Sequence, residues 1–438
     1  MNRHASEPAG AETATPPKSL RELSCADDYD PDSMPVERAR ALIRSFLAPV
    51  GATERVAIRE ALGRVLAADL VSPLAVPAHD NSAMDGYAIR FADLAPDRET
   101  VLVRVGEAFA GKPSGVPIGP GECVRIFTGG VMPEGADSVV MQERTSEQAG
   151  RVRVAAGAIT KAGQNRRFAG EDLKAGQVVF ATGQLVRPAE VGMMASLGIG
   201  EVSVYRKLRV AFFSTGDELR SIGTPLAEGE VYDSNRYTIY GMLTRLHCDV
   251  LDMGVVPDVP EALERAFTDA AAAADVVITS GGVSVGDADY VRQQLNKLGE
   301  VLFWKIAMKP GRPLAYGRIG GAHFFGLPGN PVAVMVTFYE FVRDALFVLQ
   351  GRRDVTPLPT FKVRLSAPIR KLPGRMEFQR GILAPDGNGG FTVRSTGDQG
   401  SGILSSMSQA NCFIVLPVEI GNCAVGDLVD VQLLEGLL

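Results

Sequence analysis

Turns that follow apolar runs in the second half of the chain combine acids, hydroxyls, glycine and proline. They are TGDEL at 215–219, SGGVSVGDADY at 280–290 and PGNP at 328–331, and each follows a short run typical of a buried strand. In an open parallel sheet the carboxyl ends of the strands share one edge, and ligands bind at that edge. We therefore expect the three turns to converge on one ligand.

The chemistry that these turns offer is complementary. The glycines would let backbone amides approach a ligand, and Asn330 as N-cap with Pro331 as first helical residue gives a helix start that favours an anion. The acids supply the hard oxygen ligands that Mg²⁺ uses beside phosphate oxygens, and a bridging cation would remove their repulsion of an anion. The candidate groups are Asp217, Glu218, Ser280, Gly281, Gly282, Ser284, Asp287, Asp289, Pro328, Gly329, Asn330 and Pro331.

A basic segment, FWKIAMKPGRP at 303–313, lies between the second and third turns. Its Pro and Gly residues prevent a regular helix around Lys305, Lys309 and Arg312. Cations held on such a segment suit phosphate or another oxyanion. They could instead be solvated surface charges, but the flanking Pro-Gly restraint favours binding.

A second polar cluster lies far upstream, in DNSAMDGYA at 80–88. It is either a functional site or an Asx-turn that joins two regions of the chain. The same two readings stay open for Thr128 in RIFTGG and for Glu171 and Asp172 in AGEDL.

Two familiar motifs are rejected. Residues 282–286 match a G-x-S-x-G nucleophile elbow, but the only histidine in hydrolase order, His323, opens its predicted strand and so lies at the opposite edge of the sheet from Ser284. Residues 106–112 resemble a P-loop, but Pro113 replaces the hydroxyl that Mg²⁺ needs.

The elements that must position the three turns alternate between strand and helix. Strands are predicted at 208–214, 249–256, 275–280 and 323–327, with helices at 235–247, 260–273, 288–298 and 331–349. This alternation predicts a doubly wound, mostly parallel sheet. Amphipathic spacing also predicts helices at 34–49 and 52–70.

Changes of composition and of predicted secondary structure along the chain indicate a multidomain α/β protein. We expect a disordered leader at 1–33, an elongated linking and dimerisation domain at 34–96 and 171–206, an inserted β-rich domain at 97–170, the α/β domain at 207–356 and a C-terminal β-barrel domain at 357–438.

Composition excludes several classes of protein. A net charge of −6 over 438 residues argues against a nucleic-acid-binding surface. Five dispersed cysteines suit a reducing compartment, and the N-terminus lacks the apolar core of a signal peptide. No apolar run is long and uncharged enough to span a membrane, so we expect a cytoplasmic protein.

Taken in order, the motifs DNSAMDGYA, RIFTGGVMPEGAD, TGDEL, SGGVSVGDADY, FWKIAMKPGRP and GLPGNP closely resemble the molybdopterin molybdenumtransferase family, which includes the C-terminal domain of gephyrin. The resemblance extends from about residue 35 to the end of the chain. It implies an elongated homodimer of four-domain subunits that acts on adenylylated molybdopterin and molybdate. Hydrolysis of the adenylate with Mg²⁺ would release AMP and leave molybdenum cofactor.

The resemblance also implies roles for individual residues. The catalytic positions fall on Asp85, Asp172, Glu218, Asp258, Asp289, Lys305 and Lys309, of which Glu218, Asp258 and Asp289 would be metal ligands. Arg380 and Ser401 resemble the family's molybdate-side residues, and Arg312 and Thr128 join the substrate-binding set. Asp85 and Thr128 would complete the cleft of the partner subunit.

Partners and alternatives follow from the same resemblance. Molybdopterin adenylyltransferase and apo-molybdoenzymes are the expected partners, with neither nucleic acid nor membrane. One alternative is the preceding adenylylation step, because the α/β domain alone resembles that adenylyltransferase. Another is a non-catalytic dimeric scaffold.

Overall fold

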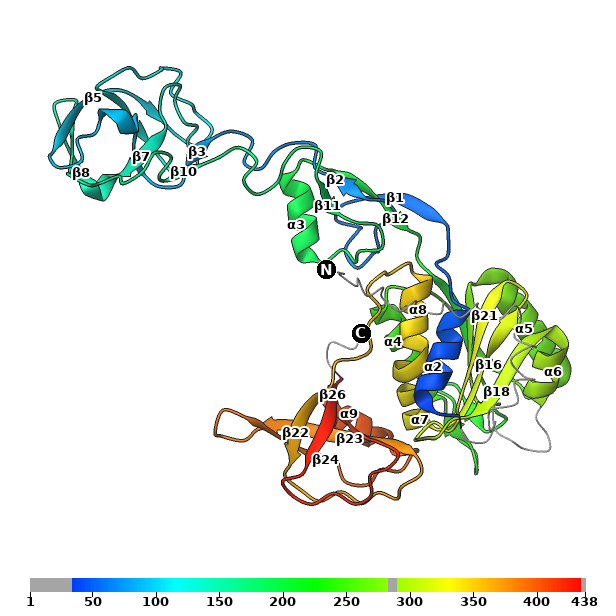
Figure 1. Ribbon diagram of the computed structural model, residues 1–438. Coiled ribbons are helices and arrows are strands. Elements are labelled where there is room, and N and C mark those ends of the chain that lie inside the picture. Colours follow the sequence, from blue (N-terminus) through cyan, green and yellow to red (C-terminus); the bar gives the residue numbers. More distant parts are fainter. Residues whose placement is uncertain (1–33, 283–289, 435–438) are drawn as a thin grey trace, which may run out of the picture.

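The computed structural model describes residues 34–282 and 290–434 as an elongated arrangement of four units. A β-rich unit lies at one end, a slender linking unit follows, and an α/β unit and a barrel lie side by side at the other end (Figure 1). None of the helices in these ranges has the length and apolar character needed to cross a membrane.

A six-stranded sheet organises the α/β unit. Its order is β16 (Asp249–Val256), β13 (Arg209–Thr215), β17 (Val276–Ser280), β21 (Ala322–Leu327), β20 (Pro313–Ile319) and β18 (Gly299–Lys305). The first four strands are parallel, and β20 runs antiparallel to both of its neighbours. The predicted fold class is confirmed, with β18 and β20 as additions that the sequence pattern did not reveal.

Helices cover both faces of this sheet because alternate strand residues are buried on opposite sides. Val210 and Phe212 pack with one helix layer, and Ala211 and Phe213 pack with the other. The first layer holds α4 (Ser234–Arg245), α7 (Pro331–Thr337), α8 (Arg343–Leu349) and α2 (Val36–Ser45); the second holds α5 (Pro260–Ala273) and α6 (Tyr290–Leu298). A π-helical turn, η3 (Phe338–Val342), interrupts the single helix expected at 331–349.

Helix α2 is the first helix of the described chain, but its apolar face belongs to the α/β core. Val36, Ala39 and Ile43 are buried there, and α2 contacts α8. The backbone of Met34 is hydrogen-bonded to the end of β18 and the residues just after it. Its N–H donates to the Lys305 carbonyl at 3.0 Å, and its carbonyl accepts from the Ala307 N–H at 2.8 Å. The sequence-based boundary placed residues 34–96 with the linking domain. In the structure Met34 and α2 pack on the α/β unit instead.

The predicted helix at 52–70 is wrong. Strand β1 (Thr53–Ala57) occupies its first part and pairs antiparallel with β12 (Glu201–Tyr205), and turns follow to residue 63. Pairing with a strand about 150 residues away overrides the local helical spacing, because the ladder satisfies backbone groups that a helix would satisfy locally. Buried Arg64 supports the turn by donating to the Glu54 carboxylate and, at 2.7 Å, to the Tyr205 carbonyl.

The linking unit is built around α3 (Pro188–Ser196) and two small sheets. Besides β1 and β12 it contains β2 (Leu70–Val71) paired with β11 (Val178–Phe180). A two-stranded neck, β3 (Asn81–Ser82) with β10 (Arg166–Arg167), then leads both passes of the chain into the β-rich unit.

The β-rich unit is a six-stranded sheet inserted between the two passes of the linking unit. Its order is β7 (Ser138–Met141), β4 (Gly86–Ile89), β6 (Glu122–Ile126), β5 (Thr100–Ala108), β9 (Arg151–Val154) and β8 (Thr145–Gln148). Short 3₁₀ turns, η1 (Phe91–Asp93) and η2 (Gln142–Arg144), join its strands. Because β4 pairs with both β6 and β7, the sheet begins before residue 97.

The C-terminal unit is a closed barrel. Strands β23 (Met376–Pro385), β24 (Phe391–Ser395), β22 (Phe361–Leu365), β26 (Leu428–Leu433) and β25 (Cys412–Leu416) are neighbours in that order, and β25 pairs with β23 to close the ring. Helix α9 (Leu404–Gln409) lies beside it. The short strand β19 (Met308–Lys309) extends from the α/β unit to pair with β23, which fixes the barrel beside the carboxyl edge of the sheet.

Candidate functional site

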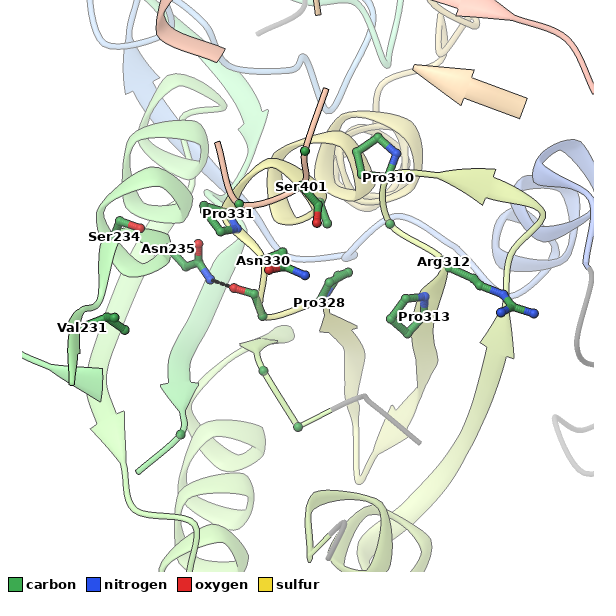
Figure 2. A pocket seen from close by; sticks show the side chains of 18 of the residues that line it. Val231, Ser234, Asn235, Pro310, Arg312, Pro313, Pro328, Asn330, Pro331 and Ser401 are labelled. Carbon is green, nitrogen blue, oxygen red and sulfur yellow. Dashed lines mark hydrogen bonds between the residues drawn. The ribbon is translucent and has the colours of Figure 1, made fainter. Parts of the chain in front are cut away.

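A cleft of about 1120 Å³ lies at the carboxyl edge of the α/β sheet, where the barrel meets it. The turns after β13, β17 and β21 all line it, as the strand order predicts, together with the segment at 308–313 and the barrel loop at 398–402 (Figure 2). The predicted site residues that line it are Glu218, Asp258, Gly281, Gly282, Lys309, Arg312, Pro328, Gly329, Asn330, Pro331 and Ser401.

The first two turns touch through their backbones at Gly281. This residue has φ of +92°, and a Cβ there would lie 2.4 Å from the carbonyl oxygen of Thr215. Its N–H donates to the Leu327 carbonyl at 3.1 Å, which joins the second turn to the third. Only glycine therefore fits where the three turns converge.

The start of α7 is arranged as the sequence predicts, but it is partly used by the barrel. Asn330 is the N-cap and Pro331 the first residue. The N–H of Val332 donates to the Ser401 carbonyl at 3.1 Å. This bond ties the barrel loop to the third turn, so the helix start contributes to closing the cleft and offers less N–H to an anion than expected.

Two of the acids that line the cleft, Glu218 and Asp258, lie on adjacent turns. Asp258 accepts a hydrogen bond from the Thr215 hydroxyl at 3.1 Å, and its N–H donates to the Asp217 carboxylate at 3.4 Å. The Glu218 carboxylate folds back over Gly216, where a Cβ would lie 2.7 Å from it. Two carboxylates thus face one cavity.

The fit of these acids to Mg²⁺ depends on what else coordinates the ion. Among residues 34–282 and 290–434, no group of three or more histidine, cysteine or acidic side chains could hold a metal by itself. Mg²⁺ is commonly bound by one or two carboxylates together with waters and substrate phosphate oxygens, which Glu218 and Asp258 can satisfy. The predicted third ligand, Asp289, lies outside the described residues, as do Ser284 and Asp287.

The basic segment is held against α7 by close packing. Gly311 has φ of +91°, and a Cβ there would lie 2.5 Å from the Thr337 hydroxyl. Lys309 and Arg312 line the cleft, and the Lys309 ammonium lies 3.7 Å from buried Glu377 of the barrel. Lys305, at the end of β18, is not among the lining residues.

Arg380 acts inside the barrel. Its guanidinium is buried and donates to the Ser406 hydroxyl and the Gly400 carbonyl, both at 2.9 Å. Its backbone N–H donates to Gln399 at 2.7 Å. Burial lowers the pKa of Arg380. The predicted molybdate-side arginine therefore shapes the 398–402 loop, and Ser401 on that loop lines the cleft.

Several lining residues were missed by the sequence analysis. They include Asp233, Ser234 and Asn235 at the start of α4, and Arg375, Asp398 and Gln399 of the barrel. Asp233 is the N-cap of α4, a signal that was present in the sequence as an acid just before a helical pattern. Asp398 and Gln399 stand in a polar, glycine-rich loop and Arg375 directly precedes β23, and neither position carries such a pattern.

Other predicted residues lie away from the cleft. Asp85 and Thr128 form a pair in the β-rich unit, where the Thr128 N–H and hydroxyl both donate to one Asp85 oxygen at 2.8 Å. Both bonds lower the pKa of Asp85, and the bond from the Thr128 backbone has the larger effect. Asp172 is exposed in a loop of the linking unit. The linking unit separates this pair from the cleft of the same chain (Figure 1).

Comparison with known families matches three consecutive parts of the chain. Three family models match in sequence order: the MoeA N-terminal region (domains I and II) at 34–198, a probable molybdopterin binding domain at 211–347 and the MoeA C-terminal region (domain IV) at 362–434. The fold and its cleft thus define a MoeA-type protein with a molybdopterin-binding type of α/β domain.

Relatives of known name specify the family. The molybdopterin molybdenumtransferase of Haemophilus influenzae is 43% identical over 404 residues, which cover 92% of this chain and 99% of the relative. That of a Nostoc species is 37% identical, covering 87% and 88%. The crystal structure of the molybdopterin biosynthesis MoeA protein from Pyrococcus horikoshii is 31% identical with a TM-score of 0.79, covering 92% and 100%. The chain belongs to the molybdopterin molybdenumtransferase family, a family of enzymes of molybdenum cofactor biosynthesis.

Proposed function

We propose that the protein inserts molybdate into adenylylated molybdopterin, with Mg²⁺-dependent hydrolysis of the adenylate and release of AMP. The observation that carries this proposal is the single cleft in which paired acids, a restrained basic segment and a polar barrel loop face one another. A substrate that carries both a phosphate and an oxyanion acceptor needs these three kinds of group in one place.

The acids and the basic segment suit the phosphate end of the substrate. Glu218 and Asp258 would hold Mg²⁺, with Asp289 as the expected third acid. When bound, the ion would neutralise phosphate charge and act as a Lewis acid. Lys309, kept beside Glu377, would stabilise the negative charge that develops as the phosphate bond breaks.

The barrel loop suits the oxyanion end. Ser401 and the exposed Arg375 line the cleft on the barrel side, where a hydroxyl and a guanidinium can bind molybdate oxygens. Arg380 would hold the loop in place through its bonds to Gly400 and Ser406. Arg312 would bind phosphate from the opposite side of the cleft.

Asp85, Thr128 and Asp172 require a second subunit in this proposal. They lie on the arm formed by the β-rich and linking units, away from the cleft of their own chain. A homodimer in which this arm reaches the partner's cleft would bring them to the substrate. The supply of adenylylated pterin by molybdopterin adenylyltransferase, delivery of the product to apo-molybdoenzymes and a cytoplasmic location belong to the same proposal.

A single-turnover assay tests the function. The purified protein is mixed with adenylylated molybdopterin and Mg²⁺, and AMP is followed with and without molybdate. Molybdate-dependent AMP release that yields a cofactor able to activate an apo-molybdoenzyme is the expected result. No AMP under either condition would contradict the proposal, and ATP-dependent formation of adenylylated pterin would indicate the preceding step instead.

A further inference from the structure

A buried asparagine at the start of α4 reaches across the floor of the cleft. Asn235 is 7% exposed, and its side-chain amide nitrogen donates two hydrogen bonds. One goes to the Ser280 hydroxyl at 2.8 Å, and the other goes to the Gly329 carbonyl at 2.7 Å. Figure 2 shows the side chain directed toward the turn that carries Pro328, Asn330 and Pro331.

These two acceptors belong to different turns of the cleft. Ser280 ends β17 just before the glycine pair, and Gly329 stands between β21 and α7. The Ser280 hydroxyl in turn donates a hydrogen bond to the Pro328 carbonyl at 3.4 Å. One amide group therefore connects the start of α4 to both turns, and Ser280 is a link in this network.

The support behind Asn235 is itself anchored. The Asp233 carboxylate accepts from the Arg236 N–H at 3.1 Å as the cap of α4, and the Arg236 guanidinium binds Asp252 on β16 at 2.7 Å. The start of α4, which carries Asn235, is thus also fixed to the sheet through Arg236 and Asp252.

The chemistry of the two bonds requires an amide. A side-chain NH₂ has two hydrogens, and both are used here. Aspartate in this place would direct a carboxylate oxygen at the Gly329 carbonyl, whereas alanine would remove the hydrogen bond that ties that carbonyl to α4.

We propose that Asn235 is a positioning residue, which holds the 280–282 turn and the 328–331 turn at the separation that a phosphate-bearing ligand needs. The identity of that ligand rests on the proposed function, whereas the coupling of the two turns does not. Asn235 acts through the backbone of Gly329 and the side chain of Ser280, so its loss changes ligand binding more than the rate of the bound complex.

The coupling is tested without any ligand, by hydrogen–deuterium exchange of the full-length protein. In Asn235→Ala, peptides that cover 279–282 and 327–332 should both exchange faster, with peptides of the barrel and the β-rich unit unchanged. Ser280→Ala removes one arm of the network and serves if Asn235→Ala does not fold. Unchanged exchange in either turn would overturn the proposal.

The functional effect is tested by steady-state kinetics with adenylylated molybdopterin. Asn235→Ala should raise KM about tenfold and lower kcat by less than roughly threefold, and Asn235→Asp should raise KM at least as much. The matched control is Asn411→Ala, because Asn411 also bridges backbone groups, those of Leu383 in the barrel at 2.8 and 2.9 Å.

The two measurements separate the possible failures. A KM in the Asn235 variants no higher than in Asn411→Ala would reduce Asn235 to a structural residue and overturn the proposal. Absence of AMP release by the wild-type protein would instead contradict the proposed function, and the exchange result would still decide whether Asn235 couples the turns.

Discussion

Aspartates are bonded to threonines at several places in the molecule, and two of these pairs, one in the cleft and one in the β-rich unit, differ in what they leave available. In the cleft, Asp258 accepts one bond from the Thr215 hydroxyl and faces a cavity of about 1120 Å³. At the far end, one Asp85 oxygen accepts both the N–H and the hydroxyl of Thr128. In the far pair both Thr128 donors are used on one carboxylate oxygen, whereas the cleft pair borders a volume that a ligand can fill.

The comparison shows that residue type alone does not identify a reacting group. The cleft pair has a second acid, Glu218, and a lysine facing the same space. The far pair lies away from that cleft, with Arg125 as its charged neighbour, so its function in the proposed enzyme depends on a partner subunit. Changes to each pair should therefore differ in size and in how they can be rescued.

The largest effect is expected at the acids of the cleft. Glu218→Gln and Asp258→Asn should each lower kcat/KM by about 100-fold and raise the Mg²⁺ concentration needed for half-maximal rate, because each removes a charged oxygen ligand. Single-turnover AMP release over a Mg²⁺ titration measures both. The control is Glu228→Gln, because Glu228 is exposed and does not line the cleft. An unaltered Mg²⁺ requirement in the cleft variants would contradict the assignment of Glu218 and Asp258 as metal ligands.

Mixing of variants tests whether the far pair serves the other subunit. Asp85→Asn and Glu218→Gln proteins are each expected to be impaired, but their coexpression should restore activity to about a quarter of wild type, since half of the dimers would be mixed and each would hold one intact site. AMP release by the copurified proteins measures this. Activity no higher than the average of the two single variants would place both residues in separate or same-chain roles.

A smaller effect is expected from the lysine of the cleft. Lys309→Ala should lower kcat by roughly tenfold, because it removes one charge from a site where negative charge develops. Lys362→Ala is a matched control, since Lys362 also pairs with an acid on the barrel, Asp430 at 2.8 Å, but does so on the surface. Equal rates for the two variants would show that Lys309 is only a structural partner of Glu377.

The smallest expected effect is on the pH dependence of stability, and it comes from Glu340, a buried acid that is not paired with a threonine. Glu340 in η3 is buried beside Arg40, and burial raises its pKa to about 7. The folded protein then binds a proton that the unfolded chain releases above its ordinary pKa of 4.5, so stability should fall as pH rises from about 4.5 to 7. Glu340→Gln should flatten this part of the curve of denaturation midpoint against pH; an identical slope in wild type and variant would contradict the assignment.

The sequence predicts the α/β unit well because its strands are buried runs bounded by turn residues. The predicted strand at 208–214 is found at Arg209–Thr215, and the predicted convergence of turns follows from strand direction. The helix expected at 52–70 is wrong because its spacing is decided by pairing with β12, which local periodicity does not contain. For the same reason, local periodicity could not predict that α2 packs against α8, which lies about 300 residues later in the chain.

The site was predictable where charge or backbone freedom marks it. Glu218, Lys309 and Gly281 fall in conspicuous motifs and line the cleft, and Asp258, which only the family resemblance indicated, lines it too. Asn235 could not be singled out, because an asparagine at the start of a helix is ordinary and its value lies in two acceptors that are distant in the chain. Ser280 was singled out, but its hydroxyl is buried in that network.

The placement of α2 has a consequence for the order in which the protein folds as it is synthesised. Val36, Ala39 and Ile43 leave the ribosome long before the strands against which they pack, and Met34 bonds to residues 305 and 307. The α/β unit therefore cannot complete its core until most of the chain has been made. A fragment that starts at residue 207 would lack one helix of that core, and supplying residues 34–49 as a separate peptide should raise its stability.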